Sequence, residues 1–277
     1  MGTMGLYLKH AYSVPANFFI HTDWVMFSRK VLNFDRHNQN RIRRFLRTYY
    51  GAFNRVFVLN NDHRKWLTGR EMNFAKDKVC LTAHWTDSIF KPEKTSKKEA
   101  LGINDHRPVM LYAGRVSKEK GVLELPHIYK VVKKAHPYVA LLVVGQGPAC
   151  EQLKKALPEG YYFDWVMRER LPAIYSAADI LVFPSKFDTF SCTILESISC
   201  GLPVIAYKTK GPKDIIKDGV CGFLVSTEEQ MSEKIINYLD NPQQQKNFRK
   251  AAVKRAKHYD VDRILERFMA DVGLKSN

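Results

Sequence analysis

Short apolar runs alternate with amphipathic segments along most of the chain. Residues 109–113, 138–144 and 180–183 are almost entirely apolar, which is typical of strands buried on both faces of a sheet. Helical periodicity fills the roughly 10–15 residues between such runs. Strands that alternate with helices of this length predict a parallel sheet with helices on both faces, so the expected fold class is α/β.

The same pattern predicts the remaining elements. Further strands are expected at 17–20, 56–59, 161–163, 204–206 and 223–225. Helices are expected at 41–53, 62–67, 121–135, 150–156, 171–178, 191–200, 228–239, 242–258 and 262–273. Thr227 and Gln230 have the spacing of a capping box at the start of helix 228–239. Residues 82–107 have little periodicity and indicate a linking segment.

Helix 41–53 is strongly amphipathic. Its other face carries Arg43, Arg44 and Arg47. A solvated face is the simpler interpretation of these arginines, and contact with acidic lipid headgroups or phosphate-bearing acceptors is the alternative. The apolar residues that define the buried face are Ile42, Phe45, Leu46, Tyr49, Tyr50 and Phe53.

Composition narrows the class of partner. The 277 residues include 45% hydrophobic residues, and 44 basic against 28 acidic residues leave a net charge of +16. This excess favours nucleotide phosphates, an acidic membrane or nucleic acid as partners. Nucleic acid is not expected, because the chain lacks a basic patch interleaved with aromatic residues and any zinc-ligand spacing.

The cysteines and the N-terminal residues indicate the compartment. The five cysteines are odd in number and form no Cys-x-x-Cys motif, and Cys80, Cys192 and Cys200 have apolar neighbours. We therefore expect buried free thiols and a reducing, cytoplasmic environment. No apolar run has the length of a bilayer span, and the first residues do not form a signal peptide. Membrane contact is expected only as a peripheral association at the inner face.

Two carboxylates bracket a predicted helix start after strand 180–183. Asp188 and Glu196 are eight residues apart, which corresponds to about 12 Å along a helix. Carboxylates that cleave a glycosidic bond lie roughly 5–10 Å apart, so this pair is better suited to hold two ends of a long ligand. The alternative is structural, with Asp188 as a helix N-cap and Glu196 as a solvated helix residue. Residues 210–214 are expected to form a loop after the next strand.

A glycine-bounded basic loop directly follows strand 109–113. Arg115 and Lys120 lie five residues apart between Gly114 and Gly121. Ligands of open parallel sheets bind at the carboxyl ends of strands, where an Arg and a Lys suit a diphosphate. With the free amides of the helix start near residue 191, these residues predict a pocket for a sugar joined to a nucleotide through a diphosphate. A solvated basic turn is the alternative.

Three further segments give weaker signals. Residues 145–148 resemble a tight turn into a helix rather than a dinucleotide fingerprint, because Cys150 stands at the third glycine position. Backbone atoms of 166–168 are candidates for contact with a base edge, although a surface turn is the simpler interpretation. His21 directly follows strand 17–20, and Asp23 lies two residues further on. It either faces a cleft or is a partly buried, hydrogen-bonded histidine.

Seven motifs in order resemble the retaining glycosyltransferases of family 4, the "group 1" glycosyltransferases with the GT-B fold. The resemblance is strong over 106–226 and looser from residue 1 through the linker, at 15–23, 60–61 and 90–92. The motifs are 113–121 (AGRVSKEKG), 144–148 (VGQGP), 176–179 (SAAD), 183–185 (FPS), 188–196 (DTFSCTILE), 201–205 (GLPVI) and 218–222 (DGVCG).

The resemblance implies a role for each matching position. Arg115 and Lys120 would neutralise the donor diphosphate, and Glu196 would accept hydrogen bonds from the ribose hydroxyls. Asp188 would hold hydroxyls of the transferred sugar, with His21 reaching it from the other domain as the second catalytic residue. The backbone that would line the sugar and phosphates belongs to Gly114, Thr189, Phe190, Ser191 and Gly211. Asp188 departs from the family pattern, where Glu is usual, and the shorter side chain would change sugar preference.

The resemblance also implies the domain organisation of a GT-B protein, with two Rossmann-like parallel-sheet domains. Residues 1–90 would be an N-terminal, acceptor-side domain lacking about its first half, and 91–107 the linker. Residues 108–258 would form the nucleotide-sugar donor domain, and 259–277 a C-terminal helix that crosses back to the N-terminal domain.

The activity implied is retaining transfer of a sugar from a nucleotide diphosphate to a lipid-linked or polysaccharide acceptor. The nucleotide sugar is a substrate, no cofactor is expected, and no metal is implied because no Asp-x-Asp pair lies near the site. The alternative is a truncated module that binds a nucleotide sugar or a partner without turnover.

Overall fold

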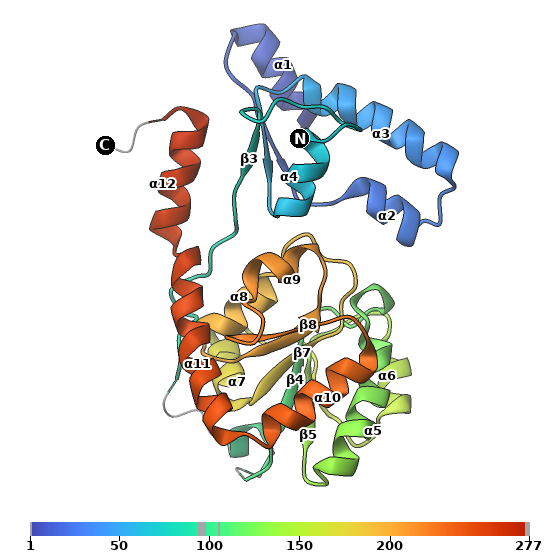
Figure 1. Ribbon diagram of the computed structural model, residues 1–277, viewed down its shortest axis with the longest axis vertical. Helices are drawn as coiled ribbons and strands as arrows, with labels where there is room; N and C mark the ends of the chain where they lie inside the picture. Colours follow the sequence, from blue (N-terminus) through green and yellow to red (C-terminus); the bar gives the residue numbers. More distant parts are fainter. Residues whose placement is uncertain (1, 94–97, 105, 275–277) are drawn as a thin grey trace. The chain divides into compact units, whose positions relative to one another are not determined.

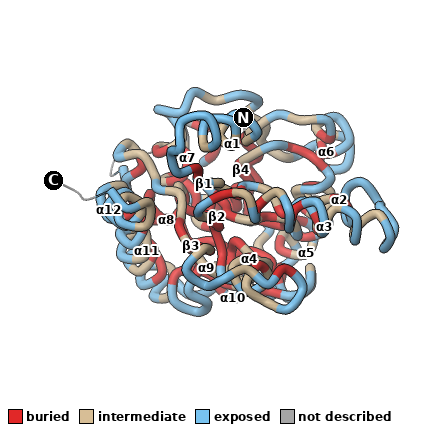
Figure 2. Tube along the Cα trace, turned by 90° about the horizontal axis from the view of Figure 1, so that it is seen from above, coloured by how far each residue is buried: buried red, intermediate tan, exposed pale blue. Residues whose placement is uncertain are grey.

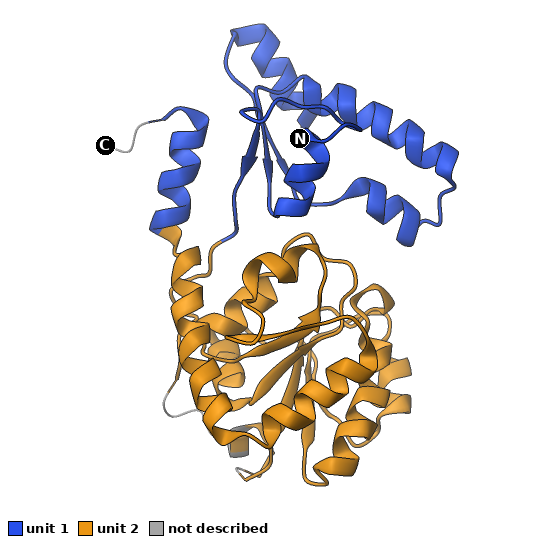
Figure 3. Ribbon diagram, in the orientation of Figure 1, with its two compact units in different colours: residues 1–84, 262–277 blue, residues 85–261 orange. Residues whose placement is uncertain are grey.

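The computed structural model describes residues 2–93, 98–104 and 106–274, which form two compact units (Figure 3). Unit 1 contains the described residues of 1–84 and 262–277, and unit 2 contains those of 85–261. Among the described residues, no helix is both long and apolar enough to cross a bilayer.

Unit 1 is built on a small parallel sheet with the strand order β1-β2-β3 (Figure 1). Ile20 pairs with Val58, and Val58 pairs with Leu81, so the strands run in register. The elements are α1 (Gly2–Tyr12), β1 (Asn17–Ile20), α2 (Trp24–Lys30), α3 (Arg36–Gly51), β2 (Arg55–Val58), α4 (Asn61–Thr68), β3 (Val79–Leu81) and, from the end of the chain, α12 (Val261–Val272).

The core of unit 1 joins segments that are far apart in the sequence. Leu46 and Tyr50 of α3 are buried against the strand residues Val56 and Val58. Phe268 of α12 lies with its ring centroid 4.7 Å from that of Phe57 in β2. Apolar burial of this kind is the main source of stability for such a small sheet.

Unit 2 contains a six-stranded, entirely parallel sheet with the order β6-β5-β4-β7-β8-β9. The chain moves outward in one direction from β4 to β6 and then restarts beside β4 with β7, so the order reverses between β4 and β7. Such a reversal leaves a crevice at the carboxyl ends of the two strands, where α/β proteins bind ligands. The strands are β4 (Val109–Ala113), β5 (Ala140–Val144), β6 (Tyr161–Phe163), β7 (Ile180–Phe183), β8 (Val204–Tyr207) and β9 (Gly222–Val225).

Helices cover the sheet of unit 2 (Figure 1), and β4, β5, β7 and β8 are buried along their whole length. Buried stretches of the chain are red in Figure 2. Uninterrupted apolar strands need cover on both faces, which explains the run of hydrophobic residues in each of them. The helices are α5 (Leu125–Ala135), α6 (Cys150–Ala156), α7 (Leu171–Ala177), α8 (Cys192–Ser199), α9 (Lys210–Ile215), α10 (Glu228–Leu239) and α11 (Pro242–Ala256).

The α/β fold class expected from the sequence is confirmed, and several expected elements need correction. Residues 210–214 form the helix α9 and not a loop. Helices α1 and α2 and strand β3 were not expected from the sequence. Helix α3 begins at Arg36 rather than residue 41, because the Asp35 side chain caps it by accepting a 2.7 Å hydrogen bond from the Asn38 amide.

Two local expectations also change. The expected capping box of α10 is only partly formed, because the Thr227 side chain accepts from the Gln230 amide while the Gln230 side chain accepts from the Ser226 amide and not from the Thr227 amide.

All five cysteines are free, and Cys80 and Cys200 are buried as expected, but Cys192 is exposed. Cys192 is the first residue of α8.

Candidate functional site

The loops that follow β4 and β7 meet at the reversal point of the unit 2 sheet. Gly121, at the end of the first loop, has a positive φ of 73°, and a Cβ there would lie 2.1 Å from the Pro184 carbonyl oxygen. Only glycine tolerates both the left-handed backbone and this close approach. Gly121 therefore seats the loop that carries Lys120 against the segment that leads to Asp188.

The Lys120 and Asp188 side chains form an ion pair, with Nζ 2.9 Å from Oδ2. The Asp188 side chain is 10% exposed and that of Lys120 is 31% exposed. The Gly211 amide donates a 3.1 Å hydrogen bond to the Asp188 backbone carbonyl oxygen, which anchors the Asp188 backbone to α9. A mostly buried carboxylate is thus held beside a cation that stays reachable from solvent.

The turn after Asp188 leads into α8 with a cap supplied by Ser191. The Ser191 hydroxyl accepts a 3.2 Å hydrogen bond from the Ile194 amide. The alternative that Asp188 caps this helix is therefore wrong. The turn is tight against α9, since a Cβ on Gly211 would lie 2.9 Å from the backbone N and Cα of Phe190.

Glu196 is held inside unit 2 by a partner that was not expected from the sequence. The Tyr175 hydroxyl donates a 3.0 Å hydrogen bond to Glu196 Oε2. Burial raises the pKa of Glu196, while the Tyr175 hydrogen bond and the charge of Arg168 oppose that rise. Glu196 is therefore not the solvated helix residue of the structural alternative.

Glu196 borders a cavity of about 230 Å³ at the carboxyl ends of β4 and β5. The Gly114 and Gly145 loops touch there, since a Cβ on Gly145 would lie 2.0 Å from the Gly114 carbonyl oxygen. The cavity is lined by Ala113, Gly114, Val144, Gly145, Asp164, Trp165, Val166, Leu171, Tyr175, Thr193 and Glu196.

Arg115 is exposed, and its side chain is not among those that line this cavity. Its backbone is fixed, because the Tyr112 hydroxyl donates a 2.6 Å hydrogen bond to its carbonyl oxygen. Burial opposes ionisation of the neighbouring Glu119, but hydrogen bonds and the charges of Arg115 and Lys120 together lower its pKa. The basic loop therefore carries an acidic side chain of its own.

His21 belongs to unit 1, where it follows β1. Its ring stacks on that of Phe19 at 4.5 Å and lies 5.5 Å from that of His84. Burial and then the charge of His21 lower the pKa of His84. Asp23, the carboxylate of the same motif, caps α2 by accepting a 2.9 Å hydrogen bond from the Met26 amide.

Of the predicted site residues, unit 2 brings together Lys120 with Asp188, Glu196 with Gly114, and the turn 189–191 with Gly211. Tyr175 and Thr193, which also line the cavity, were not expected from the sequence. Tyr175 lies 21 residues before Glu196, so no local periodicity relates the two residues.

Known proteins with related sequences transfer sugars. The chain is 25% identical over 187 residues to the alpha-D-kanosaminyltransferase of Streptomyces kanamyceticus, covering 63% of this chain and 48% of that protein. It is 29% identical over 154 residues to the lipopolysaccharide 1,2-N-acetylglucosaminetransferase of Salmonella typhimurium, covering 50% of this chain and 40% of that protein. The chain therefore spans about half the length of the curated relatives that it matches.

Solved structures show the same fold. Sucrose-phosphate synthase from Thermosynechococcus elongatus superposes with a TM-score of 0.83 at 20% identity, covering 97% of this chain and 70% of that one. HepE from Anabaena in complex with UDP gives a TM-score of 0.81 at 16% identity, covering 98% and 76%. The fold is accordingly of the GT-B type.

The sequence of unit 2 settles the family. The family described as "Glycosyl transferases group 1" matches residues 93–255, which include β4 through α8 and all the unit 2 residues of the candidate site. The chain belongs to the group 1 glycosyltransferases.

Proposed function

We propose that the protein transfers a sugar from a nucleoside-diphosphate donor to a lipid or glycan acceptor with retention of the anomeric configuration. The observation that carries the proposal is the convergence of the 114–121 loop, the Lys120–Asp188 pair and Glu196 at one edge of the unit 2 sheet. Anionic and hydroxyl-rich ligands need cations and carboxylates in close reach, and both are supplied here.

The nucleoside end of the donor would occupy the cavity beside Glu196. Its volume of about 230 Å³ is below the roughly 300–1,000 Å³ of pockets that enclose a whole drug-sized ligand, so it suits one part of a nucleotide sugar. Glu196, positioned by Tyr175, would accept hydrogen bonds from the ribose hydroxyls. Backbone groups near Val166 would meet the base.

The diphosphate would lie between the basic loop and the start of α8. Lys120 has three donor hydrogens, so it can bind a phosphate oxygen while keeping one hydrogen bond to Asp188. Arg115, exposed on the same loop, would turn toward the second phosphate. The amides of Thr189, Phe190 and Ser191 precede an eight-residue helix, whose dipole favours an anion at that end.

In the transfer step, the bond between the anomeric carbon and the diphosphate oxygen breaks while the acceptor oxygen bonds to the same carbon from the same face. The acceptor proton leaves with the diphosphate. Lys120, Arg115 and the α8 amides would stabilise the charge that develops on the leaving group. Asp188 would hold hydroxyls of the sugar, and His21 would contribute from unit 1. We propose no resident cofactor, because the nucleotide sugar already carries its activated leaving group.

The proposal includes the setting of the reaction. We place it in the cytoplasm, with peripheral contact at the inner face of a membrane for a lipid-linked acceptor. A module that binds the donor without turnover is the second candidate function.

The test is a thermal-shift and calorimetry screen with UDP, GDP, ADP and their sugars, followed by a transfer assay. Binding of one nucleoside diphosphate together with transfer to an acceptor supports the enzyme. Binding without transfer or donor hydrolysis supports the second candidate. No binding of any nucleoside diphosphate would contradict both.

A further inference from the structure

Glu124 joins three strand connections of unit 2, although it is not among the residues predicted for the donor site. It ends the short 3₁₀ helix Val122–Glu124 in the loop after β4. Its Oε1 atom lies 2.6 Å from Nζ of Lys186, in the segment after β7. Its Oε2 atom accepts a hydrogen bond from the hydroxyl of Tyr207, the last residue of β8. We refer to Glu124, Lys186 and Tyr207 together as the latch.

The third side of the latch is a contact between Lys186 and Tyr207. The Lys186 ammonium nitrogen lies 4.7 Å from the centre of the Tyr207 ring, within the range of a cation–π interaction. Tyr207 is only 3% exposed, and a buried hydroxyl needs a hydrogen-bond partner, which Glu124 supplies. Burial and the hydrogen bond to Glu124 raise the pKa of Tyr207, so the hydroxyl keeps the proton that it donates.

The latch is the third attachment of segment 184–188 to the loop after β4. Gly121 packs against the start of this segment, and Lys120 pairs with Asp188 at its end. Lys186 lies between these two points, two residues before Asp188. The latch therefore acts on the Asp188 carboxylate through the backbone that connects Asp188 to Lys186.

The effect of the latch is expected to be local. The Lys186 side chain is 56% exposed and that of Glu124 is 23% exposed. Ion pairs with an exposed member contribute little to the free energy of unfolding. Loss of this pair should therefore leave unit 2 folded and free segment 184–188 to move.

We propose that Glu124 is a positioning residue, which fixes segment 184–188 so that Asp188 meets the sugar of the donor. The inference rests on the proposed function, in which Asp188 holds hydroxyls of the transferred sugar. Hydrogen bonds weaken steeply with distance and angle, so a displaced backbone changes which hydroxyls the carboxylate reaches. Glu196, in another segment, would still hold the nucleoside. Sugar recognition should therefore depend on the latch more than nucleotide binding does.

The first experiment measures amide hydrogen exchange of the full chain by NMR without a donor. The Gly211 amide reports on the segment, because it donates to the Asp188 backbone carbonyl oxygen at 3.1 Å. Glu124→Gln keeps an acceptor for the Tyr207 hydroxyl and removes the charge beside Lys186. Lys186→Met breaks the same pair from its exposed side. Each variant should speed exchange of the Gly211 amide by at least about fivefold.

The second experiment uses the nucleoside diphosphate and nucleotide sugar selected from UDP, GDP, ADP and their sugars. In both variants, kcat of transfer should fall by about tenfold or more, while the Kd of the nucleoside diphosphate stays within about twofold. Lys186→Arg keeps the pair and should restore kcat. Combining Glu124→Gln with Lys186→Met should cost no more than either change alone, because both remove one interaction.

The matched control is an ion pair of the same composition elsewhere in unit 2. Lys133 Nζ lies 3.4 Å from Glu159 Oε1 and 5.4 Å from the centre of the Tyr129 ring. Tyr129 is 2% exposed, so this site also combines a lysine, a carboxylate and a buried tyrosine. Lys133→Met and Glu159→Gln should leave exchange of the Gly211 amide and kcat within about twofold of the parent chain.

The outcomes separate this inference from the proposed function. Unchanged exchange of the Gly211 amide, or an equal change in the controls, overturns the inference. A parallel loss of nucleoside-diphosphate affinity and kcat also overturns it, because a general structural role would produce that result. If the parent chain binds the donor without transfer, affinity for the nucleotide sugar replaces kcat as the deciding measurement. A parent chain that binds no nucleoside diphosphate contradicts the proposed function and this inference with it.

Discussion

Lys120 Nζ lies 2.9 Å from Asp188 Oδ2, which joins the loop after β4 to the segment after β7 across 68 residues of sequence. The cation expected to meet the diphosphate and the carboxylate expected to meet the sugar are thus each other's partners before a donor arrives. A donor that binds here must share Lys120 with Asp188, so the pair links phosphate binding to the position of the carboxylate.

Replacing Lys120 by Ala should weaken nucleoside-diphosphate binding by more than about tenfold, because a charge-assisted hydrogen bond to phosphate is lost. It also leaves the Asp188 carboxylate without its cation, so unfolding should become easier. Arg115→Ala should weaken binding similarly but without the loss of stability, because Arg115 is exposed. Calorimetry and urea unfolding measure both effects.

The matched control for Lys120→Ala is Lys118→Ala, because both lysines belong to the short 3₁₀ helix Lys118–Lys120 and Lys118 is exposed. Lys120→Ala combined with Asp188→Asn should recover stability but not affinity. Unchanged nucleotide affinity in Lys120→Ala would exclude this lysine from the donor site.

Glu196→Gln should raise stability at neutral pH and abolish most nucleoside affinity. Burial raises the pKa of Glu196 above its ordinary value, so the folded state binds the proton more readily than the unfolded state. The loss of folding free energy caused by the buried Glu196 charge is absent below the pKa of Glu196 in the unfolded chain. This loss grows as the pH rises through the pKa of Glu196 in the folded protein. The amide keeps an acceptor for the Tyr175 hydroxyl.

Urea unfolding of the parent chain and of Glu196→Gln at acidic and neutral pH tests this sign. The stability gap should be widest at neutral pH and close toward acid. A stability gap that widens toward acid instead would mean that Glu196 is stabilised as a carboxylate.

Tyr175→Phe should weaken nucleoside-diphosphate binding and leave pyrophosphate binding unchanged.

Gly121→Ala should disrupt the junction between the two loops. The added Cβ would lie 2.1 Å from the Pro184 carbonyl oxygen at a φ of 73°, and strain of this kind costs about 1–3 kcal/mol. Lys120 would be displaced with it, so donor affinity should fall together with the melting temperature. Gly51→Ala is the control, because its Cβ would meet only a Phe74 ring atom at 3.9 Å.

Asp179, part of the 176–179 motif, has a structural role. Its carboxylate accepts hydrogen bonds from the Val109 amide at 2.8 Å and Lys98 at 2.7 Å, and it pairs with Arg249 at 3.2 Å. Asp179→Ala leaves these donors without their acceptor, so it should cost about 3 kcal/mol of unfolding free energy. Asp179→Asn, which retains one acceptor oxygen, should cost less.

Equilibrium unfolding measures the unfolding free energies of the two Asp179 variants. Calorimetry with nucleoside diphosphates on the folded variants is the control. Nucleotide affinity per folded molecule should remain at the parent value. A specific loss of affinity at full stability would assign Asp179 to the donor site instead.

Local sequence patterns were sufficient for most of the fold. Strands β4 and β7 match their predicted bounds, Val109–Ala113 and Ile180–Phe183, because unbroken apolar runs leave few alternatives to a strand buried on both faces. The alternation of strands and helices then made a parallel sheet necessary. Helix α9 was missed because a segment of six residues with Gly and Pro has no helical periodicity to read.

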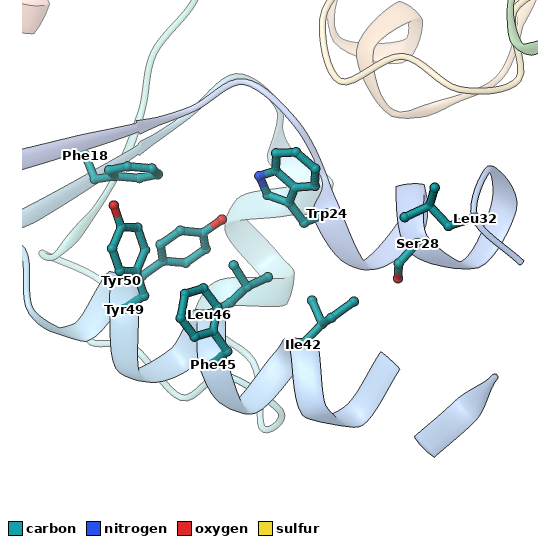
Figure 4. Close-up of a pocket in the computed structure, with 9 residues that line it drawn as sticks. All are labelled: Phe18, Trp24, Ser28, Leu32, Ile42, Phe45, Leu46, Tyr49 and Tyr50. Atoms are coloured by element: carbon teal, nitrogen blue, oxygen red, sulfur yellow. The ribbon is translucent and has the colours of Figure 1, made fainter. Parts of the chain in front are cut away.

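The sequence by itself determined the α/β class, the six strands of unit 2 and the positions of the candidate donor residues, since each of these depends on neighbours within about a dozen residues. Only the tertiary structure paired Lys120 with Asp188 and Tyr175 with Glu196, and only it formed an apolar groove between α2 and α3 (Figure 4). The reason is that side-chain partners across a sheet are chosen by strand order and close packing, which bring together residues that no periodic pattern relates.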